Sequence, residues 1–343
     1  MRIIHTADLH LDSPINGLPS EKSVIRRKET VRTFGKIVEI AQETGAEIVI
    51  IAGDLFDSEH VTKSTTEYVL NRIKSANNII FCYLRGNHDE KAPLIMTELP
   101  ENLIFMDSKN NRLSPDKNMT ITAFTDYHDF DTVPTFDKDK FNIVIYHGEV
   151  APIVSMIEGK NIDYLALGHY HKRDFGYIGN RGIWIYPGCP NGRGFDECGE
   201  KGIELIDITG KELDHRFIPT CDRIYHDIKL DVSGLTSSAE YAAEIMAATD
   251  DIPDSDLVRI ELIGKTNADF SLDSPIIHES LERLFGYKLI DNSEIVPDKN
   301  LINEVSLKGE FARLAEKGDY DSEIRNLILR YGFAALSGEE FPE

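Results

Sequence analysis

Cysteine, long apolar runs and signal-like segments are scarce in this sequence. Four cysteines occur in 343 residues, at positions 82, 189, 198 and 221, and none of them forms a CxxC pair. Such spacing argues against a disulfide scaffold and indicates a reduced chain. No apolar run approaches the roughly 20 residues that span a bilayer, and His5, Asp8 and His10 interrupt the N-terminal apolar stretch that a signal peptide needs. We therefore expect a cytoplasmic protein with no membrane partner.

Positive charge is also in short supply. The chain has 37 Lys and Arg residues against 59 Asp and Glu residues, for a formal net charge of −22. Non-specific binding to nucleic acid depends on cationic side chains that release counterions from the phosphate backbone. This composition therefore argues against binding a phosphate backbone through bulk electrostatics. If the protein acts on phosphate, metal ions or a partner protein must bring the positive charge.

Apolar runs that alternate with helix-compatible stretches predict an α/β layered fold. Residues 21–44 and 62–77 carry apolar side chains at helical spacing. The continuous apolar runs before, between and after them are typical of strands buried on both faces. These runs are RIIHTAD (2–8), EIVIIAGD (47–54), NIIFCYLRGN (78–87), FNIVIYHG (141–148) and DYLALGH (163–169).

The later part of the chain predicts a second, smaller domain. A length of 343 residues favours two domains over one. The block 223–296 is read as strand, helix, strand and helix, and residues 297–343 are read as two helices. We therefore expect a domain over 1–222, a small α+β domain over 223–296 and a helical tail over 297–343.

Five short polar clusters each follow an apolar run, at the edge where ligands of open α/β sheets collect. Their side chains offer imidazole nitrogens, carboxylate oxygens and one amide oxygen, a donor set that suits Mn²⁺, Fe or Zn²⁺. A lone DxH or GD cluster is more often a cap or a turn than a ligand, and His169-x-His171 alone fits either role equally well. Five such clusters in succession predict a metal site. They are Asp8-Leu-His10, Gly53-Asp54, Gly86-Asn87-His88-Asp89, His147-Gly148 and Gly168-His169-Tyr-His171.

The number of these donors predicts two ions. Seven ligand groups are too many for one cation, and they suit two ions about 3.5–4 Å apart, which can clamp the attacking and leaving oxygens of phosphoryl transfer. A carboxylate can offer one oxygen to each ion. Asp54 directly follows Gly53, which permits a sharp turn, so Asp54 is the expected bridge.

These clusters resemble the five signature motifs of the calcineurin-like metallophosphoesterases. Within that superfamily, HTADLHLD, IIAGDLFD, LRGNHD and LGHYHK resemble the SbcD-type DNA repair nucleases, over roughly residues 1–200. The resemblance implies a layered β-sandwich flanked by helices, with the 223–296 block as a small α+β capping domain. It also implies two divalent metal ions, most often Mn²⁺, that activate a water for in-line attack on a phosphodiester.

The family pattern implies specific ligand sets. One metal would take Asp8, His10, Asp54 and His171, and the second would take Asp54, Asn87, His147 and His169. His88 is not a ligand in that pattern and would protonate the leaving oxygen as general acid.

Asp57 departs from the pattern of those relatives that have a histidine at this position. A carboxylate near His88 would favour its imidazolium form and fix its orientation. We therefore predict an Asp57–His88 dyad. The alternative is that Asp57 caps the N-terminus of a helix.

The loop YPGCPNGRGFDE (186–197) contains a single cation, Arg193. A guanidinium matches phosphate bidentately, so Arg193 is a candidate phosphate ligand. A structural ion pair to Asp196, to Glu197 or to the capping domain explains the same residue equally well. His5 fits a core histidine better than a residue that supports the metal ligands.

The resemblance further implies partners. SbcD-type nucleases act on DNA with an SMC-like, SbcC-type ATPase that docks on C-terminal helices, and they form homodimers. Ile324, Leu327, Ile328 and Tyr331 form an apolar stripe that is either a docking face or part of the tail's own core.

The favoured function is a metal-dependent DNA exonuclease, with endonuclease activity as an addition, in double-strand-break repair. A capping block over the site favours DNA, whereas the acidic surface favours the alternative, a phosphatase or phosphodiesterase acting on small nucleotides or phosphoproteins. A third class, a non-catalytic scaffold for an ATPase, fits poorly with an intact ligand set.

Overall fold

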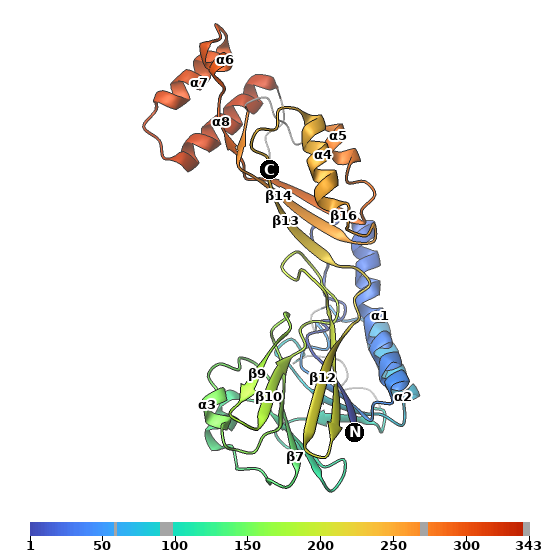
Figure 1. Ribbon diagram of the computed structural model, residues 1–343. Coiled ribbons are helices and arrows are strands. Elements are labelled where there is room, and N and C mark those ends of the chain that lie inside the picture. The colour runs from blue at the N-terminus through green and yellow to red at the C-terminus, as the bar shows by residue number, and fades with distance from the viewer. Residues whose placement is uncertain (58–59, 90–98, 268–273, 339–343) are drawn as a thin grey trace. The chain divides into compact units, whose positions relative to one another are not determined.

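The computed structural model describes residues 1–57, 60–89, 99–267 and 274–338. The chain divides into two compact units, Met1–Ile224 and Tyr225–Glu343, and Figure 1 shows the elements of each. No helix in the described ranges has the length and hydropathy needed to span a membrane.

Two six-stranded sheets form the centre of the first unit. The first sheet has the order β12-β11-β1-β2-β3-β4 and the second the order β5-β6-β7-β8-β10-β9. Strands β1 to β4 run parallel, as do β6, β7, β8 and β10. The first sheet comprises β1 (Arg2–Thr6), β2 (Ile48–Ala52), β3 (Ile80–Leu84), β4 (Leu103–Met106), β11 (Gly202–Thr209) and β12 (Glu212–Pro219). The second comprises β5 (Arg112–Leu113), β6 (Met119–Phe124), β7 (Phe141–His147), β8 (Tyr164–Gly168), β9 (Asp174–Ile178) and β10 (Gly182–Tyr186).

The continuous apolar run of β2 follows from burial on both faces. Val49 and Ile51 pack in the cluster that includes helices α1 (Ser20–Thr44) and α2 (Lys63–Ser75). Successive strand side chains point to opposite faces, so Ile48 and Ile50 pack in the cluster between the two sheets. The predicted layered sandwich flanked by helices is therefore confirmed.

The outer face of the second sheet is covered by short helical segments, η2 (Tyr127–Thr132) and α3 (Val154–Ile157). Phe130 and Ile157 from these segments pack with Val144 of β7.

A buried ion network joins α1 to the loop after β10. Arg26 is fully buried and pairs with Glu29 one turn later. The Glu29 carboxylate also accepts hydrogen bonds from Arg223, with the Arg223 Nη2 atom 2.9 Å from Oε1. On its other side, Arg26 donates to the Asn191 side chain at 2.7 Å and to the Gly192 carbonyl at 2.6 Å. This network fixes where the loop lies on the helix.

The second unit contains a three-stranded parallel sheet of order β13-β14-β16. Helices α4 (Ser238–Thr249) and α5 (Pro275–Glu279) contribute Tyr241, Ile245 and Ile277 to one apolar cluster with the strands β13 (Tyr225–Asp231), β14 (Leu257–Ile263) and β16 (Gly286–Asp291). The first helix begins with a capping box between Ser237 and Glu240. The second helix predicted in 223–296 is short, since α5 ends at Glu279.

The described part of the tail holds three helices where two were expected: α6 (Lys299–Asn303), α7 (Leu307–Lys317) and α8 (Ser322–Ser337). The short α6 begins after Asp298, whose side chain accepts the Leu301 amide. A two-stranded sheet of β15 (Lys265–Thr266) and β17 (Glu294–Ile295) precedes them. The roles of 223–296 as a capping domain and of 297–343 as a docking tail stay predictions.

The apolar stripe predicted on the last helix is divided. Ile328 packs against the small cluster formed by Ala312, Ala315, Leu329 and Phe333. By contrast, Ile324, Leu327 and Tyr331 are 47%, 46% and 42% exposed.

We predict that Glu29→Gln destabilises the chain by about 3–5 kcal/mol, because two guanidinium groups then lack the charge they are buried against. Urea unfolding of the full chain would measure the loss. The matched control is Glu39→Gln on the same helix. Glu39 pairs with Arg72 and is 59% exposed, so its loss should stay below about 1 kcal/mol. Equal changes in both variants would contradict the prediction.

Candidate metal centre

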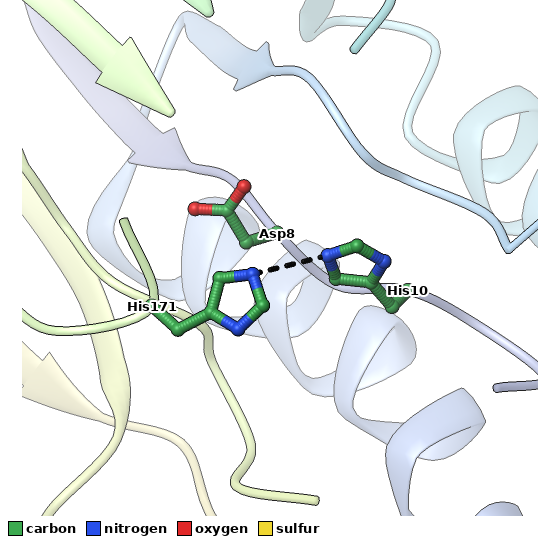
Figure 2. A group of neighbouring side chains, drawn as sticks. All are labelled: Asp8, His10 and His171. Atoms are coloured by element: carbon green, nitrogen blue, oxygen red, sulfur yellow. Dashed lines mark hydrogen bonds between the residues drawn. The ribbon is translucent and has the colours of Figure 1, made fainter. Parts of the chain in front are cut away.

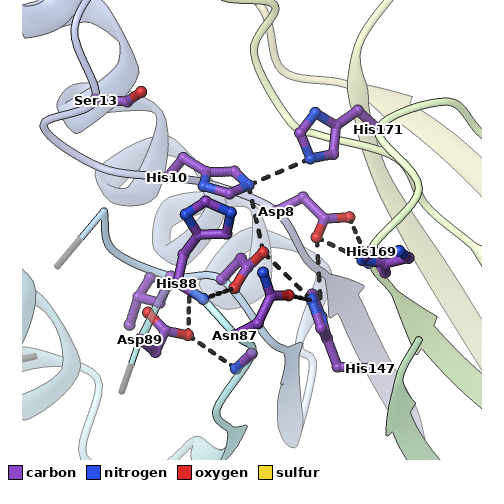
Figure 3. Close-up of polar contacts among 12 residues, drawn as sticks. Asp8, His10, Ser13, Asn87, His88, Asp89, His147, His169 and His171 are labelled. Atoms are coloured by element: carbon purple, nitrogen blue, oxygen red, sulfur yellow. Dashed lines mark hydrogen bonds and ion pairs between the residues drawn. The ribbon is translucent and has the colours of Figure 1, made fainter. Parts of the chain in front are cut away.

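The predicted ligands lie directly after the ends of parallel strands, where the two sheets of the first unit meet (Figure 3). Asp8 and His10 follow β1, Asp54 follows β2, and Asn87 and His88 follow β3. From the second sheet, His147 is the last residue of β7, and His169 and His171 follow β8. Residues from five separate segments are thus brought to one place.

The backbone at this place is strained. Asp8, His10, Asp54 and His169 have φ values of 54°, 43°, 50° and 105°, a region that side-chain-bearing residues rarely adopt. Such conformations persist only where the surroundings hold them, and they cluster at functional sites. Here the loops hold each other, because the Asp8 amide donates to the Gly53 carbonyl at 3.1 Å and the His10 amide to the Asp54 carbonyl at 2.9 Å.

Two of the motif glycines are required because predicted ligands lie too close to them to leave room for a side chain. A Cβ atom on Gly53 would lie 2.1 Å from the His147 ring, and one on Gly86 would lie 2.2 Å from the Asp54 carboxylate. Any larger residue would therefore displace a predicted ligand.

The Asp54 carboxylate lies at the middle of the cluster. Its Oδ2 atom is 3.5 Å from His10 Nε2 and 3.3 Å from His147 Nε2, while Oδ1 accepts the His88 amide at 2.9 Å. One carboxylate oxygen therefore lies within reach of imidazoles from both sheets. This is the position that a bridging ligand requires.

The remaining ligands flank Asp54 on two sides. On one side, the Nε2 atoms of His10 and His171 face each other at 3.2 Å, next to Asp8 (Figure 2). On the other side, Asn87 Oδ1 lies 3.1 Å from His147 Nε2. The backbone amide of His169 donates to the Asp8 carboxylate at 2.9 Å.

The donor atoms fit divalent metal ions. Three overlapping groups have ligand atoms within 4.8 Å of one another: Asp8, His10 and His171; Asp8, Asp54 and His147; and His10, Asp54 and His88. The buried Nδ1 atom of His10 has no hydrogen-bond partner among the described residues. No donor to Nδ1 therefore forces the ring proton onto Nε2, and the Nε2 lone pair can bind a metal. Imidazole, carboxylate and amide donors together suit Mn²⁺, Fe or Zn²⁺.

Burial and mutual contact shift the pKa values of the cluster. Burial raises the pKa of Asp8 to about 6 and lowers the pKa of His10 to about 3. Burial would also raise the pKa of Asp54, but hydrogen bonding and the charge of His147 lower it to about 2. Burial opposes protonation of His147, and contact with Asp54 outweighs it and raises the pKa to about 8. Contact between Asp54 and His147 therefore favours the charged form of both groups.

Asp89 is a site residue that the sequence reasoning did not assign. It is fully buried, and its carboxylate accepts the amides of Leu55, Phe56 and Gly86 at 2.8–3.1 Å. It therefore ties the loop that carries Asp54 to the loop that carries Asn87. The signal was its place directly after His88, within the GNHD motif.

His88 lies next to the first group of ligands. Its ring is exposed and sits edge-on to the His10 ring, with centroids 4.9 Å apart. Among the described residues, the Asp57 carbonyl accepts the amides of His60 and Val61. The N-cap of α2 is Thr62, so the alternative role of Asp57 as the cap of that helix is wrong. The dyad stays a prediction.

Arg193 contacts its own loop and two other segments, and its Nη2 atom lies 3.1 Å from His171 Nδ1. Its Nη2 atom donates to Glu197 Oε1 at 2.7 Å, and its Nη1 atom lies 3.3 Å from Ser13 Oγ. The ion pair with Glu197, one of the two explanations of this residue, is therefore present, and phosphate binding stays a prediction. His5 is buried in the core, with Nδ1 2.7 Å from the Tyr164 hydroxyl, and burial lowers its pKa to about 3.

The family model described as "Calcineurin-like phosphoesterase" matches residues 1–173, half of the chain. This chain therefore belongs to the calcineurin-like phosphoesterase family, and the predicted family membership is confirmed.

Named relatives resemble the chain at low identity. The DNA double-strand break repair protein Mre11 of Methanosarcina acetivorans is 26% identical over 306 aligned positions, which cover 82% of this chain and 48% of that protein. The uncharacterized metallophosphoesterase YhaO of Bacillus subtilis is 25% identical, covering 68% of this chain and 64% of its own. The SbcD subunit of the nuclease SbcCD from Staphylococcus saprophyticus is 24% identical, covering 85% of this chain and 92% of its own. The chain thus spans about half of the Mre11 protein and less than two thirds of YhaO.

A solved dimetal phosphatase from Danio rerio is 9% identical, with a TM-score of 0.47 over 64% of this chain and 96% of that one.

We predict that Asp54→Asn abolishes stabilisation by metal, because Asp54 lies between both groups of ligands. At a metal concentration 100 times the dissociation constant, the unchanged protein should gain about 2.7 kcal/mol in its free energy of unfolding. Thermal unfolding of metal-free protein with and without Mn²⁺ measures this gain. Asp12→Asn, which alters a buried carboxylate bound to Arg27 and the Thr62 amide, is the control. A full Mn²⁺ shift in Asp54→Asn would contradict the assignment.

Proposed function

We propose that this chain is a phosphodiesterase that uses two divalent cations to hydrolyse DNA. The observation that carries the proposal is the place of Asp54 Oδ2, which lies 3.5 Å from His10 Nε2 and 3.3 Å from His147 Nε2. One ion would be held by Asp8, His10, Asp54 and His171, and the other by Asp54, Asn87, His147 and His169. Mn²⁺ is the proposed metal, with Fe and Zn²⁺ as alternatives from the same donor set.

Two such cations supply Lewis acidity and a water of lowered pKa for in-line attack on phosphorus. The protein's part is to hold the donors in a fixed arrangement, through the strained loops and the Asp89 carboxylate. His88 is the proposed general acid, because its ring is exposed next to His10 and can reach a leaving oxygen. Asp57 is the proposed carboxylate that orients His88, and Arg193 is the proposed phosphate ligand.

DNA as the substrate is supported by the relatives. Both the Mre11 protein and the SbcD subunit carry names that refer to DNA repair or nuclease activity. A net charge of −22 means that the surface as a whole repels a phosphate backbone. Binding of DNA then depends on the two cations and on a partner protein, so we propose an SbcC-type ATPase as that partner. Homodimer formation and a cytoplasmic location complete the proposal, and the four free cysteines are consistent with a reducing compartment.

The second candidate function is hydrolysis of a small phosphoester. The acidic charge favours it, since a small substrate needs only the local charge of the metal centre. The two functions share every ligand, and only the substrate separates them.

A paired assay tests both candidates. Metal-free protein is reloaded with Mn²⁺ and given end-labelled duplex and single-stranded DNA, and separately bis-p-nitrophenyl phosphate. We expect Mn²⁺-dependent shortening of DNA that falls about 10²–10⁴-fold in His88→Ala, the usual contribution of a general acid. The matched control is His128→Ala, a histidine whose side chain is 81% exposed and lies outside the site. Turnover of the diester with intact DNA, also after addition of the ATPase, would favour the small substrate.

The exposed part of α8 is the proposed docking surface for the ATPase. Ile324, Leu327 and Tyr331 are exposed, whereas Leu329 and Phe333 fill the small core of the tail. The surface residues are thus separate from the packed ones.

We predict that Leu327→Glu leaves the thermal unfolding of the full chain unchanged and abolishes binding of an SbcC-type ATPase. The physical reason is that Leu327 is 46% exposed, so a charge there costs little in the free chain and much in an apolar interface. Analytical ultracentrifugation of the mixture measures binding. Lys317→Glu on α7 controls for the change of charge. Unimpaired binding by Leu327→Glu would exclude this surface.

A further inference from the structure

The His171 ring is held on both sides by different groups. Its Nδ1 atom lies 2.6 Å from Glu197 Oε1, and its Nε2 atom lies 3.2 Å from His10 Nε2. Figure 2 shows the Nε2 side, turned toward His10 and Asp8. A carboxylate paired with a guanidinium only accepts hydrogen bonds, whereas the Arg193 Nη2 atom, a donor, lies farther from Nδ1, at 3.1 Å. The shorter contact with Glu197 therefore favours a proton on Nδ1 of His171. That leaves the lone pair of Nε2 directed at the metal centre.

We infer that Glu197 is a positioning residue that fixes the tautomer and the ring orientation of His171 for metal binding. The inference rests on the metal site proposed above. Glu197 lies outside the proposed ligand set, in the same loop as Arg193, the predicted phosphate ligand. Carboxylates that accept the second ring proton of a ligating histidine raise its basicity and hold its plane.

The other imidazoles of the centre are held differently. Nδ1 of His147 donates to the backbone carbonyl of Ala52 at 2.8 Å. Nδ1 of His10 has no hydrogen-bond partner among the described residues. A backbone acceptor is present whatever the sequence, whereas the acceptor at His171 depends on one side chain. Of these three imidazoles, His171 is therefore the one whose Nδ1 acceptor a single side-chain substitution can remove.

Glu197 is itself firmly placed. It is 4% exposed, its amide donates to the Gly194 carbonyl at 3.0 Å, and its Oε2 accepts the Arg193 amide at 2.7 Å. The preceding residues of the loop are bound to the buried Arg26 through Asn191 and Gly192. The loop is thus anchored to α1 on one side and to the His171 ring on the other.

The same segment also binds the main chain of His171. Its carbonyl accepts the Lys201 ammonium at 3.0 Å and the Cys189 amide at 3.3 Å. Backbone and ring of this one residue are therefore fixed by residues 189–201, which is more than the ion pair between Arg193 and Glu197 would need.

If Glu197 is only the structural partner of Arg193, its replacement should lower the stability of the protein but leave the His171 ring unchanged. The two roles are separated by the tautomer, which long-range nitrogen–proton NMR reads for each histidine in metal-free, full-length protein.

For the unchanged protein we expect a proton on Nδ1 of His171. Glu197→Gln should keep this tautomer, because the amide oxygen still accepts the proton. Glu197→Ala should shift it toward the Nε2 form, with the His147 signals unchanged as an internal reference. An unaltered His171 tautomer in Glu197→Ala would overturn the inference.

Metal binding gives the second readout. Titration of metal-free protein with Mn²⁺ should show one of two ions bound about 10-fold more weakly in Glu197→Gln and about 100-fold more weakly in Glu197→Ala, the range found for such supporting residues. Asp196→Asn, which alters the exposed neighbouring carboxylate, should bind both ions normally. Equal affinities in all variants would overturn the inference.

The two experiments distinguish a failure of the Glu197 inference from a failure of the proposed function. Unchanged protein that binds no Mn²⁺ would overturn the metal site, while the tautomer would still report on the Glu197–His171 pair. If Glu197→Ala does not fold, Glu197→Gln keeps the shape and the acceptor and decides the question through its Mn²⁺ affinity.

Discussion

The placement of the Asp54 carboxylate is the constraint on which the candidate site depends. Asp54 has a positive φ although it is not a glycine. Backbone hydrogen bonds from the loop after β1 and the carboxylate of Asp89 hold its loop in this conformation. The absence of a side chain at Gly86 leaves the room that the carboxylate occupies. Strain of this kind persists only where surrounding contacts over-determine it. Those contacts come from the segments that follow β1 and β3.

Charge connects the site to the rest of the molecule. The centre gathers carboxylates and imidazoles in a buried place within a chain of net charge −22. Burial opposes charge on Asp8 and His10, while Asp54 and His147 keep theirs through mutual contact. A divalent cation would satisfy the carboxylates by supplying positive charge. It would bind the imidazole nitrogens in their neutral form, so binding at His147 would release the proton that Asp54 favours there.

The supporting residues form a second layer of organisation. Arg26 and Glu29 on α1, the loop after β10 and its Glu197 carboxylate form one connected set that ends on His171. Hydrogen bonds make its two ends, and the chain from Gly192 to Arg193 joins them. Most of its members are buried, so removing any charge from it leaves another charge unpaired in a place with little water. A substitution in this set therefore affects both the placement of His171 and the packing of α1.

Local patterns determined the strands, the long helix and the five polar clusters. Burial on both faces makes β2 a continuous apolar run, and strand order then carries Asp8, Asp54 and His147 to one edge, which is why family and layered fold were predictable. The contacts of Glu197 with His171 and of Glu29 with Arg223 carry no such local signal, because these partners lie 26 and 194 residues away along the chain. Asp89 stands in the GNHD motif, but its role depends on the Phe56 amide, which is 33 residues away. The stripe on α8 shows the same limit, since helical spacing marks Ile328 and Leu327 alike and only packing separates the buried residue from the exposed one. The sequence by itself determined which chemistry is carried at the strand ends; the tertiary structure alone decided which side chains hold that chemistry in place, because hydrogen-bond partners are chosen by distance in space and not along the chain.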